Sequence, residues 1–444
     1  MKHNLLRTLC ACLALWMLLT AFGIPAFADD AEEEIPAEPN VIHASAAYLY
    51  NFENNQVLFE MNADAKVYPS STVKLMTAIV VMERFADAMD TTVTVTQEMI
   101  DQAVGNTIEF TAGEVVTVEQ MLYGMLVSSA NDAAIILAYA VGGDIPTFVE
   151  MMNAKAAELG AVNTTYTNPT GMHDPAMSTT ARDTAVIARY AYTLPGLAKI
   201  TSTPKYVMEA TNISDYRNLY NRNAMISKYY SADYYYPRAL GLNAGATTQG
   251  GYSICAVAED PDSGLTYLAV VLGADSNNTE LYHYKGAIEM LDWAFNSYSY
   301  TLVLSTRKTI CEIPVNLSAT IDYVTLVPKE NISVYLPATV DLDTELRYSY
   351  NTYTEAMDAP VEAGTEAGII TVFLGEEILG SCPLVTTSSV TRSEFLHFLD
   401  EIQEFTEGRF FRGMVISAAV LSVLYVFLRA RQREKKLRRM SGRR

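Results

Sequence analysis

Two apolar segments near the ends of the chain, each beside positive charges, constrain what the rest can fold into. Residues 1–28 begin with Lys2 and Arg7, continue with an apolar core at 13–22 and end in the small-residue sequence Ala26-Phe27-Ala28. This order predicts a secretory signal peptide, with an uncleaved N-terminal anchor as the alternative. The chain that follows is therefore expected to fold outside the cytoplasm.

The second apolar segment is predicted to be a transmembrane helix over residues 412–428. Residues 413–428 carry no charge. The basic tail that follows at 429–444 predicts that the C-terminus lies in the cytoplasm. A buried core helix is the alternative. Residues 391–411 predict an amphipathic helix, because large apolar side chains recur on one face: Phe395, Phe398, Leu399, Ile402 and Phe405.

Charge and cysteine content exclude several classes of function. The net charge is −20, although the tail at 429–444 is strongly basic, so the body of the chain is acidic and would repel phosphate backbones. Nucleic acid is therefore not an expected partner. Beyond the N-terminal apolar segment, Cys255, Cys311 and Cys382 are widely spaced and odd in number. They predict buried free thiols rather than a disulfide framework or a metal site, and no cofactor is expected.

The part between the two apolar segments divides by composition. Residues 29–41 are acidic and contain prolines, which predicts a flexible leader. Residues 42–304 begin with a strand hairpin at 44–61, continue with several helical patterns and return to strands, which predicts an α+β domain. Residues 305–390 carry short Val, Ile, Thr and Tyr runs between turn residues, which predicts a small all-β sandwich domain.

The first candidate for chemistry is the S-x-x-K pair of Ser71 and Lys74, at the start of an apolar helical run over residues 73–85. Helix positions three apart share a face, so the lysine amine can reach the serine hydroxyl. A serine becomes a nucleophile when a neighbouring base takes its proton, and a lysine can be that base if its pKa is lowered. The same spacing at Ser202 and Ser305 opens no apolar helix.

A second candidate is Ser129-Ala130-Asn131, which follows an apolar helix that begins with a capping-box sequence at 117–120. A serine hydroxyl at this place can pass a proton to a leaving amine. An asparagine amide can hold Lys74 and the carbonyl of a substrate.

With these two motifs the chain resembles the penicillin-binding D-alanyl-D-alanine carboxypeptidases, the low-molecular-mass serine peptidases of the bacterial wall. The resemblance covers about residues 42–390 and is specific in combination. It rests on residues 68–77, 126–134, 168–175 and 178–183, and on 358–384 for the β-rich second domain. It implies a β-lactamase/transpeptidase-like catalytic domain, followed by the all-β domain and a C-terminal membrane attachment.

The chain departs from the family at the third motif. The family has Lys-Thr-Gly on a strand, whereas Asn243, Ala244 and Gly245 stand at that place here. Gly245 still permits close approach of a ligand to the strand. A hydrogen bond to a charged group contributes roughly 1.5–3 kcal/mol, so losing the lysine is expected to lower rate or affinity on the order of 10- to 100-fold.

The resemblance assigns roles to the remaining residues. Ser71 is expected to attack the carbonyl between two D-alanines with Lys74 as base, while Ser129 protonates the leaving D-alanine and Asn131 positions the substrate. Water then releases the acyl group.

Three further residues complete the expected substrate site. Backbone N–H groups of Ser71 and Ala246 are expected to form the oxyanion hole. Asn243 can still donate a neutral hydrogen bond. Arg182 is a candidate for part of the missing charge, with a structural ion pair as the alternative.

The sequence thus predicts a serine-type D-Ala-D-Ala carboxypeptidase of reduced activity that trims peptidoglycan stem peptides and binds β-lactams. It is expected in the cell membrane as a single-pass protein with its catalytic domain outside. A catalytically impaired, membrane-tethered wall-peptide binding protein of the same fold is the alternative. A β-lactamase is less favoured, because no convincing loop between the motifs carries the carboxylate base that fast deacylation needs.

Overall fold

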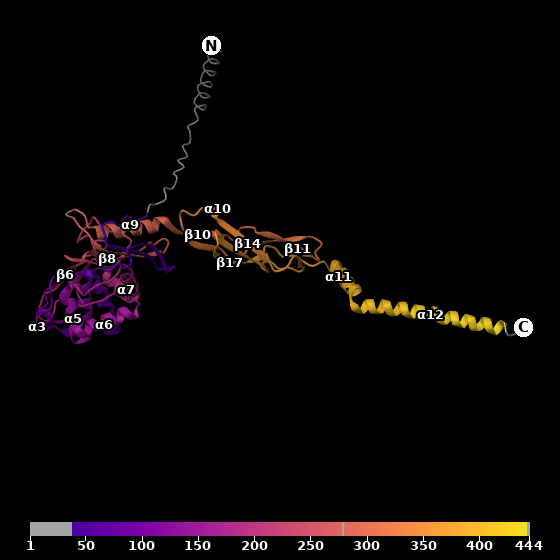
Figure 1. Ribbon diagram of the computed structural model, residues 1–444, viewed down its shortest axis with the longest axis horizontal. Helices are drawn as coiled ribbons and strands as arrows, with labels where there is room; N and C mark the ends of the chain where they lie inside the picture. The colour runs from indigo at the N-terminus through magenta and orange to yellow at the C-terminus, as the bar shows by residue number, and fades with distance from the viewer. Residues whose placement is uncertain (1–37, 278, 442–444) are drawn as a thin grey trace, which may run out of the picture. The chain divides into compact units, whose positions relative to one another are not determined.

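The structure is a computed structural model that describes residues 38–277 and 279–441 (Figure 1). The predicted signal peptide and most of the predicted leader lie outside the described residues. Contacts divide the chain into two compact units, with the boundary in the sequence between Ser297 and Tyr298. Each unit is described by itself.

A five-stranded antiparallel sheet organises the first unit, in the order β2-β1-β9-β8-β7. The predicted hairpin at 44–61 is confirmed as the pair β1 and β2, and β1 also pairs with β9 from the other end of the unit. Strand β7 lies at the edge of the sheet. The strands are β1 (Ala46–Asn51), β2 (Gln56–Met61), β7 (Ala239–Thr247), β8 (Gly251–Glu259) and β9 (Thr266–Ala274).

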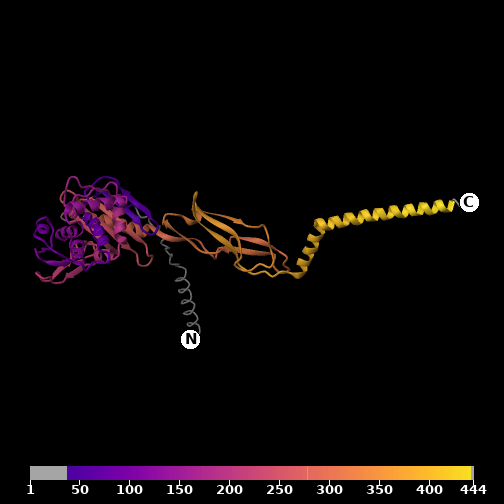
Figure 2. The same ribbon diagram turned by 90° about the horizontal axis from the view of Figure 1, so that it is seen from below.

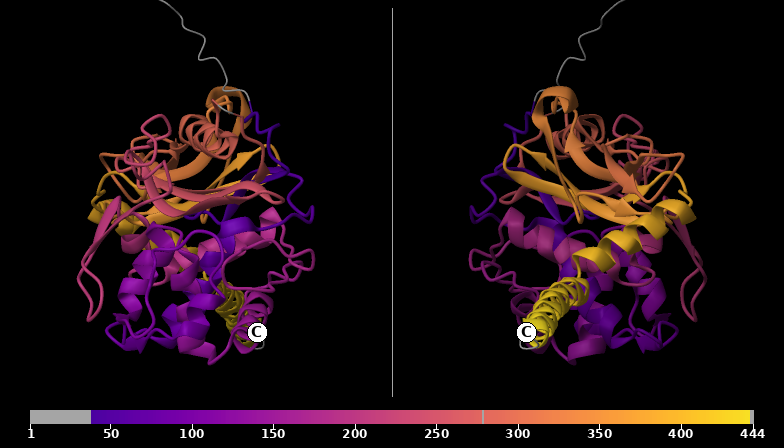
Figure 3. Two further views of the ribbon diagram at one scale, coloured as in Figure 1. Left: turned by 90° about the vertical axis from the view of Figure 1, so that its left-hand side faces the viewer. Right: turned by 90° about the vertical axis from the view of Figure 1, so that its right-hand side faces the viewer.

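Helices cover both faces of this sheet. Helix α9 (Tyr282–Ser297) packs on β8 and β9, and α7 (Ala181–Thr193) packs on β1 and β9 below it in the view of Figure 1. Figure 3 shows the purple helices of the first half of the unit gathered beneath the sheet. They are α2 (Val73–Arg84), α3 (Gln97–Asp101), α4 (Val118–Val127), α5 (Asn131–Gly142) and α6 (Ile145–Glu158), with α8 (Leu197–Thr201) nearby.

Helix α2 is the centre of the helical layer. Ten of its twelve residues are buried, and it packs against α5, α6 and α7. Apolar side chains all round a helix require burial on every side, so α2 cannot lie at the surface. A single 3-10 turn at Ser70–Thr72 precedes it and places Ser71 just before the first α-helical residue.

Side-chain hydrogen bonds fix the starts of helices α4 and α5. The predicted capping box is confirmed at the start of α4, where Gln120 N donates to Thr117 Oγ1 at 3.1 Å and Thr117 N donates to Gln120 Oε1 at 2.9 Å. At the start of α5, the buried Asp132 accepts hydrogen bonds from the backbone N–H groups of Ile108 and Phe110. Two short antiparallel strand pairs complete the unit. They are β3 (Thr92–Thr94) with β4 (Val115–Thr117) and β5 (Lys205–Met208) with β6 (Arg217–Tyr220).

The second unit is built on a six-stranded sheet with the order β14-β16-β17-β12-β11-β15 and a separate pair of β10 with β13. Because β10 pairs with β13, the structure groups residues 298–304 with the β-rich unit, whereas the sequence placed them in the first domain. The strands are β10 (Tyr298–Leu304), β11 (Cys311–Asn316), β12 (Tyr323–Pro328), β13 (Ile332–Pro337), β14 (Leu346–Thr352), β15 (Met357–Asp358), β16 (Glu366–Leu374) and β17 (Glu377–Thr386).

The core of this unit is small and apolar. Its fully buried members include Leu326, Ile370, Val372, Cys382 and Leu384, and one four-residue helix, α10 (Leu342–Glu345), interrupts the strands. The three cysteines of the described chain are free thiols, and Cys255 and Cys382 are buried as predicted, whereas Cys311 is only partly buried.

Two helices end the chain. In α11 (Glu394–Glu407) the apolar side chains predicted to share a face are all exposed, and Leu396 N donates to the Ser393 side chain at its start. Helix α12 (Arg409–Ser441) is one continuous helix (Figure 2). Within the described chain it alone is long and apolar enough by itself to cross a membrane, with a mean hydropathy of 2.0 over its most apolar 18 residues. Helices α5 and α6 pass the same test only when joined across an 85° bend.

Candidate active site

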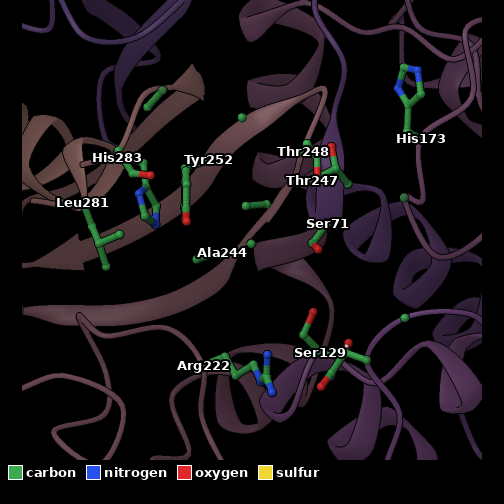
Figure 4. Close-up of a pocket in the computed structure, with 18 of the residues that line it drawn as sticks. Ser71, Ser129, His173, Arg222, Ala244, Thr247, Thr248, Tyr252, Leu281 and His283 are labelled. Carbon is green, nitrogen blue, oxygen red and sulfur yellow. The ribbon is translucent and has the colours of Figure 1, made fainter. Parts of the chain in front are cut away.

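A pocket of about 710 Å³ opens in the first unit between the start of α2, the α4–α5 turn and strand β7. Five of the residues proposed from the sequence line it: Ser71, Ser129, Asn131, Gly245 and Ala246. Figure 4 shows Ser71 above Ser129, with Arg222 on the Ser129 side of the pocket. The structure thus brings together side chains from three distant parts of the sequence.

Ser71 is held directly against the edge strand. A Cβ built on Gly245 would lie 2.4 Å from both Cβ and Oγ of Ser71, so only glycine fits at this place in β7. Thr72 Oγ1 donates to the Pro69 carbonyl oxygen at 2.6 Å and braces the turn that carries Ser71. The serine oxygen is therefore fixed next to strand backbone, where peptide N–H groups can face a developing oxyanion.

Lys74 lies one helical turn after Ser71, behind the surface of the pocket. It is 1% exposed, and its Nζ donates to the Thr170 carbonyl oxygen at 2.7 Å. Burial, and to a smaller extent the positive charge of Arg222, lower the pKa of Lys74 from 10.5 to about 7. A substantial fraction of the amine is thus uncharged near neutral pH and can accept a proton.

The loop around Gly171 presents the carbonyl that Lys74 binds. Asn168 Oδ1 accepts hydrogen bonds from the backbone N–H groups of Thr170 and Gly171, at 3.2 and 2.9 Å. Gly171 has a φ of +80°, and a Cβ on it would lie 2.0 Å from the carbonyl oxygen of Ser70. The loop is therefore packed tightly against the turn that carries Ser71.

The second motif is held in a tight turn. Ser129 is 9% exposed, and its φ of +55° is unusual for a residue with a side chain. Asn106 Nδ2 donates to the carbonyl oxygens of Ser128 and Ser129, at 2.6 and 3.0 Å, and Asn131 Nδ2 donates to the Val104 carbonyl oxygen at 2.6 Å. The structure gives Lys74 the Thr170 carbonyl as its partner, rather than the Asn131 amide that the sequence suggested.

The third motif contributes its small residues to the pocket and not its asparagine. Ala244, Gly245 and Ala246 line the pocket, whereas Asn243 lies outside the lining residues and is 2% exposed. Asn243 Oδ1 has no hydrogen-bond partner among the described residues. An unpaired buried amide oxygen is unfavourable, so this position is poorly matched to its surroundings.

Arg182 lies away from the pocket. Its guanidinium makes ion pairs with Asp64 at 2.8 Å and Glu60 at 3.0 Å, and it does not line the pocket. The structure therefore shows the ion pair that was the alternative to a role in substrate binding.

Arg222, which the sequence reasoning missed, is the one lysine or arginine among the described residues that line the pocket. No hydrogen bond or ion pair of its side chain occurs within the described chain. Its backbone is fixed, because Arg222 N donates to the Val127 carbonyl oxygen at 3.0 Å and its own carbonyl accepts from Tyr284 Oη at 2.9 Å. The only sequence signal was the polar triplet Asn221-Arg222-Asn223, in which both asparagines are buried.

Comparisons with known proteins agree with this arrangement. The family model described as D-alanyl-D-alanine carboxypeptidase, peptidase family S11, matches residues 32–276, which is more than half of the chain. A second model, the C-terminal domain of penicillin-binding protein 5, matches residues 298–392. The D-alanyl-D-alanine carboxypeptidase DacF of Bacillus subtilis is 27% identical over 406 residues, which cover 89% of this chain and 97% of the relative.

Two solved structures show the same fold. Penicillin-binding protein 5 of Haemophilus influenzae is 25% identical with a TM-score of 0.55, and the match covers 80% of this chain and 99% of that one. The carboxypeptidase DacD of Francisella tularensis, 23% identical, has a TM-score of 0.57 over 83% of this chain and 100% of its own length. The predicted fold, a transpeptidase-like α+β domain followed by a small β domain, is confirmed. The chain belongs to the D-alanyl-D-alanine carboxypeptidase family of serine peptidases.

Proposed function

We propose that this chain is a serine-type D-alanyl-D-alanine carboxypeptidase that trims peptidoglycan stem peptides through an acyl-Ser71 intermediate and is acylated by β-lactams at the same serine. The observation that carries the proposal is the buried Lys74, one turn after Ser71, with a pKa lowered to about 7. Family membership supports the enzyme over the alternative of a wall-peptide binding protein.

Acylation uses the residues that meet in the pocket. Lys74 takes the proton of the Ser71 hydroxyl, and Oγ attacks the carbonyl carbon of the penultimate D-alanine. Backbone N–H groups of Ser71 and Ala246 receive the oxyanion, which the close contact of Gly245 with Ser71 supports. Ser129 passes a proton to the leaving nitrogen as the C–N bond breaks, and Asn131 orients the substrate with its amide oxygen.

Deacylation reverses the proton transfers. A water molecule gives a proton to Lys74 and attacks the ester carbonyl, and Ser71 leaves with that proton restored to its oxygen. The shortened stem peptide then departs with a new C-terminal carboxylate.

Arg222 replaces part of the charge that the third motif lacks. A terminal D-alanine carries a carboxylate, and the family lysine that would face it is Asn243 here. Arg222 lines the pocket with a guanidinium that has no carboxylate partner within the described chain, so it is placed to bind an anion. The pocket then has Arg222 alone, without the lysine of the family motif, so the activity on D-Ala-D-Ala peptides is expected to be reduced.

The proposed location is the outer face of the cell membrane. Helix α12 fits a single membrane anchor, and basic residues follow its apolar part. We propose a single-pass protein with its catalytic domain outside the cell and its C-terminus in the cytoplasm.

Labelled penicillin tests the proposal. Intact-mass measurement of the detergent-solubilised chain is expected to show one penicilloyl adduct on wild type and none on Ser71→Ala. Ser202→Ala, which alters another S-x-x-K sequence in the same unit, is the matched control and keeps the adduct. Wild type without an adduct under these conditions would refute the acyl-serine mechanism.

A further inference from the structure

A groove of about 420 Å³ lies beside the active-site pocket and is here called the tyrosine groove. It is lined by residues 106–108, Ser128, residues 218–220, Arg222, Tyr229 and Tyr230. Its three tyrosines, Tyr220, Tyr229 and Tyr230, are 43, 68 and 51% exposed. Large rings that gather uncovered at a surface mark a place where a ligand or partner binds.

The tyrosine groove adjoins the active-site pocket. Asn106, Arg222 and Tyr230 line both of them. Figure 4 shows Arg222 on the Ser129 side of the active-site pocket, so the groove joins the pocket on that side. A ligand in the groove would therefore lie next to the site of catalysis without entering it.

The rings of the groove are held by the elements that carry them. Tyr220 ends strand β6, and its ring centroid lies 5.1 Å from that of Tyr229, with the two planes inclined at 55°. Farther along the loop of Tyr229, Tyr234 Oη accepts a hydrogen bond from Leu281 N at 2.8 Å, and Tyr236 is buried. Two tyrosines thus anchor the loop, while Tyr229 stays exposed at the groove.

The tyrosine groove combines its rings with polar groups and little charge. The Thr107 hydroxyl and the Asn218 side-chain amide line it, and no hydrogen bond engages either group within the described chain. Arg222 is the one charged residue among the described lining residues, in a chain whose net charge is −20. Because an amide both donates and accepts hydrogen bonds, such walls can pair with the hydroxyl groups of a neutral ligand.

These features exclude several ligands that bind to aromatic rings. A cationic ligand is disfavoured, because Arg222 lines the groove and Lys205 Nζ already lies 5.4 Å from the centroid of the Tyr220 ring. Nucleic acid needs several cations for its phosphates, and the groove offers one. A sugar ring has apolar C–H faces and polar hydroxyls at its edge, so it matches both the tyrosine rings and the amide.

We propose that the tyrosine groove binds the glycan strand that carries the stem peptides, a chain of N-acetylated hexosamines. The inference rests on the carboxypeptidase function proposed above, whose substrate peptides are attached to this polymer. Two successive sugars lie with their C–H faces on Tyr220 and Tyr229, and Thr107 and Asn218 pair with their hydroxyl or acetamido groups. No carboxylate lines the groove among the described residues, so the strand is bound there and not cleaved.

Sugar binding at this place holds the enzyme on its polymer. One strand carries many stem peptides, so a stretch of sugars in the groove raises the local concentration of neighbouring stems at Ser71. The groove contains neither Ser71 nor Lys74. The effect is therefore expected in the KM for a polymeric substrate, and not in kcat or in the hydrolysis of a free peptide.

Calorimetric titration of the detergent-solubilised full chain with chitotetraose, an oligomer of β-1,4-linked N-acetylglucosamine, tests the binding directly. Wild type is expected to bind it, and Tyr220→Ala combined with Tyr229→Ala should raise the Kd at least about tenfold. Tyr229→Phe keeps the ring and should keep the Kd within about twofold of wild type. Tyr353→Ala, which removes a ring 61% exposed in the second unit, is the matched control and should leave the Kd unchanged.

Release of D-alanine from two substrates tests the consequence. One is an uncross-linked glycan strand that bears pentapeptide stems, and the other is the free pentapeptide. In wild type the KM, expressed per stem, is expected to be at least about fivefold lower for the strand. The double variant should lose this difference while it keeps the wild-type kcat and KM for the free pentapeptide. Its acylation by penicillin at the wild-type rate shows that it is folded.

The outcomes separate this inference from the proposed function. Absence of both D-alanine release and the penicilloyl adduct in wild type would overturn the proposed function, whereas the titration measures sugar binding by itself. Chitotetraose that does not bind wild type, or that binds the double variant equally well, would overturn the inference alone. Binding of a decaproline peptide in place of chitotetraose would do the same, because extended proline helices also lie on aromatic rings.

Discussion

Lys74 Nζ donates a 2.7 Å hydrogen bond to the carbonyl oxygen of Thr170, a residue of the loop that packs on the turn of Ser71. A carbonyl accepts a hydrogen bond from a neutral or a charged amine, so it holds the side chain without fixing its charge. A carboxylate at this place would instead stabilise the ammonium and keep the base protonated. Because its partner is a peptide oxygen, the pKa of Lys74 is lowered mainly by burial, with no nearby carboxylate to raise it.

The acylation rate is expected to depend on pH through Lys74. The pKa of the buried amine is lowered to about 7, and only the uncharged form accepts the Ser71 proton. The second-order rate of penicillin acylation should be half-maximal near pH 7 and fall about tenfold for each pH unit below it. A rate that is constant from pH 5 to 8 would contradict a lysine base.

Stability is also expected to rise with pH. The pKa of Lys74 is lower in the folded chain than its ordinary 10.5, so the unfolded chain binds more protons between about pH 7 and 10.5. The wild-type free energy of unfolding should increase across this window by roughly 3–5 kcal/mol. Lys74→Met should remove the increase, and Lys205→Met, at an exposed lysine, should keep it. Denaturation followed by the fluorescence of Trp293 in α9 measures both.

Arg222→Gln is expected to change two quantities at once. The positive charge of Arg222 lowers the pKa of Lys74, so its removal should move the midpoint of the pH–acylation curve to higher pH. Loss of the anion partner should also lower kcat/KM on a D-Ala-D-Ala peptide on the order of 10- to 100-fold. Arg238→Gln, which breaks an ion pair with Asp260 outside the pocket, is the control. An unshifted midpoint would exclude electrostatic coupling between Arg222 and Lys74.

Two glycines with similar backbones allow a test of the loop. Gly171 and Gly160 have φ values of +80° and +87°, but a Cβ on Gly171 would lie 2.0 Å from the Ser70 carbonyl, while one on Gly160 meets no described atom within 4 Å. Gly160→Ala should therefore show only the backbone strain of about 1–2 kcal/mol. Gly171→Ala should destabilise further and slow acylation of Ser71. Equal effects in unfolding and acylation assays would contradict the close packing.

Restoring the family's third motif tests whether its loss lowers the activity on D-Ala-D-Ala peptides. Asn243→Lys combined with Ala244→Thr is expected to raise turnover of a D-Ala-D-Ala peptide on the order of 10- to 100-fold, because a second cation would join Arg222. Asn243 is buried and its Oδ1 has no hydrogen-bond partner among the described residues, so the change would remove few favourable contacts of the wild-type amide. Turnover that does not rise would show that the motif is not what limits the reaction.

Local sequence rules predict the positions of Ser71 and Lys74 well and the residues around them poorly. The spacing of Ser71 and Lys74 is a property of one helix, so periodicity was enough to put both on the same turn. The Thr170 carbonyl and Arg222 reach Lys74 from other parts of the chain, and no pattern near Lys74 signals them. Their roles emerge only when the loop and the β6–β7 segment are folded around α2.

Arg182 shows the limit of a resemblance between segments. The resemblance of residues 178–183 to the family does not say on which face of α7 the Arg182 side chain lies. The deciding partners, Asp64 and Glu60, come from the chain around hairpin β1–β2, more than 100 residues away in the sequence. By contrast, the division into an α+β part and a β-rich part follows from composition and pattern, because helical and strand-rich stretches are separated along the chain, whereas the transpeptidase-like fold follows from the family resemblance.

Strand β7 has a neighbour on one side only, since the sheet ends there. An extended peptide lying along that open side would be read by its main chain, through the spacing of its amide groups, more than by the identity of its side chains. The configuration at each α-carbon of the peptide would then matter more than the size of its side chain. Inverting the configuration turns the side chain toward the strand, whereas a longer side chain of the same configuration projects away from it. Such a surface discriminates stereochemistry while tolerating variety.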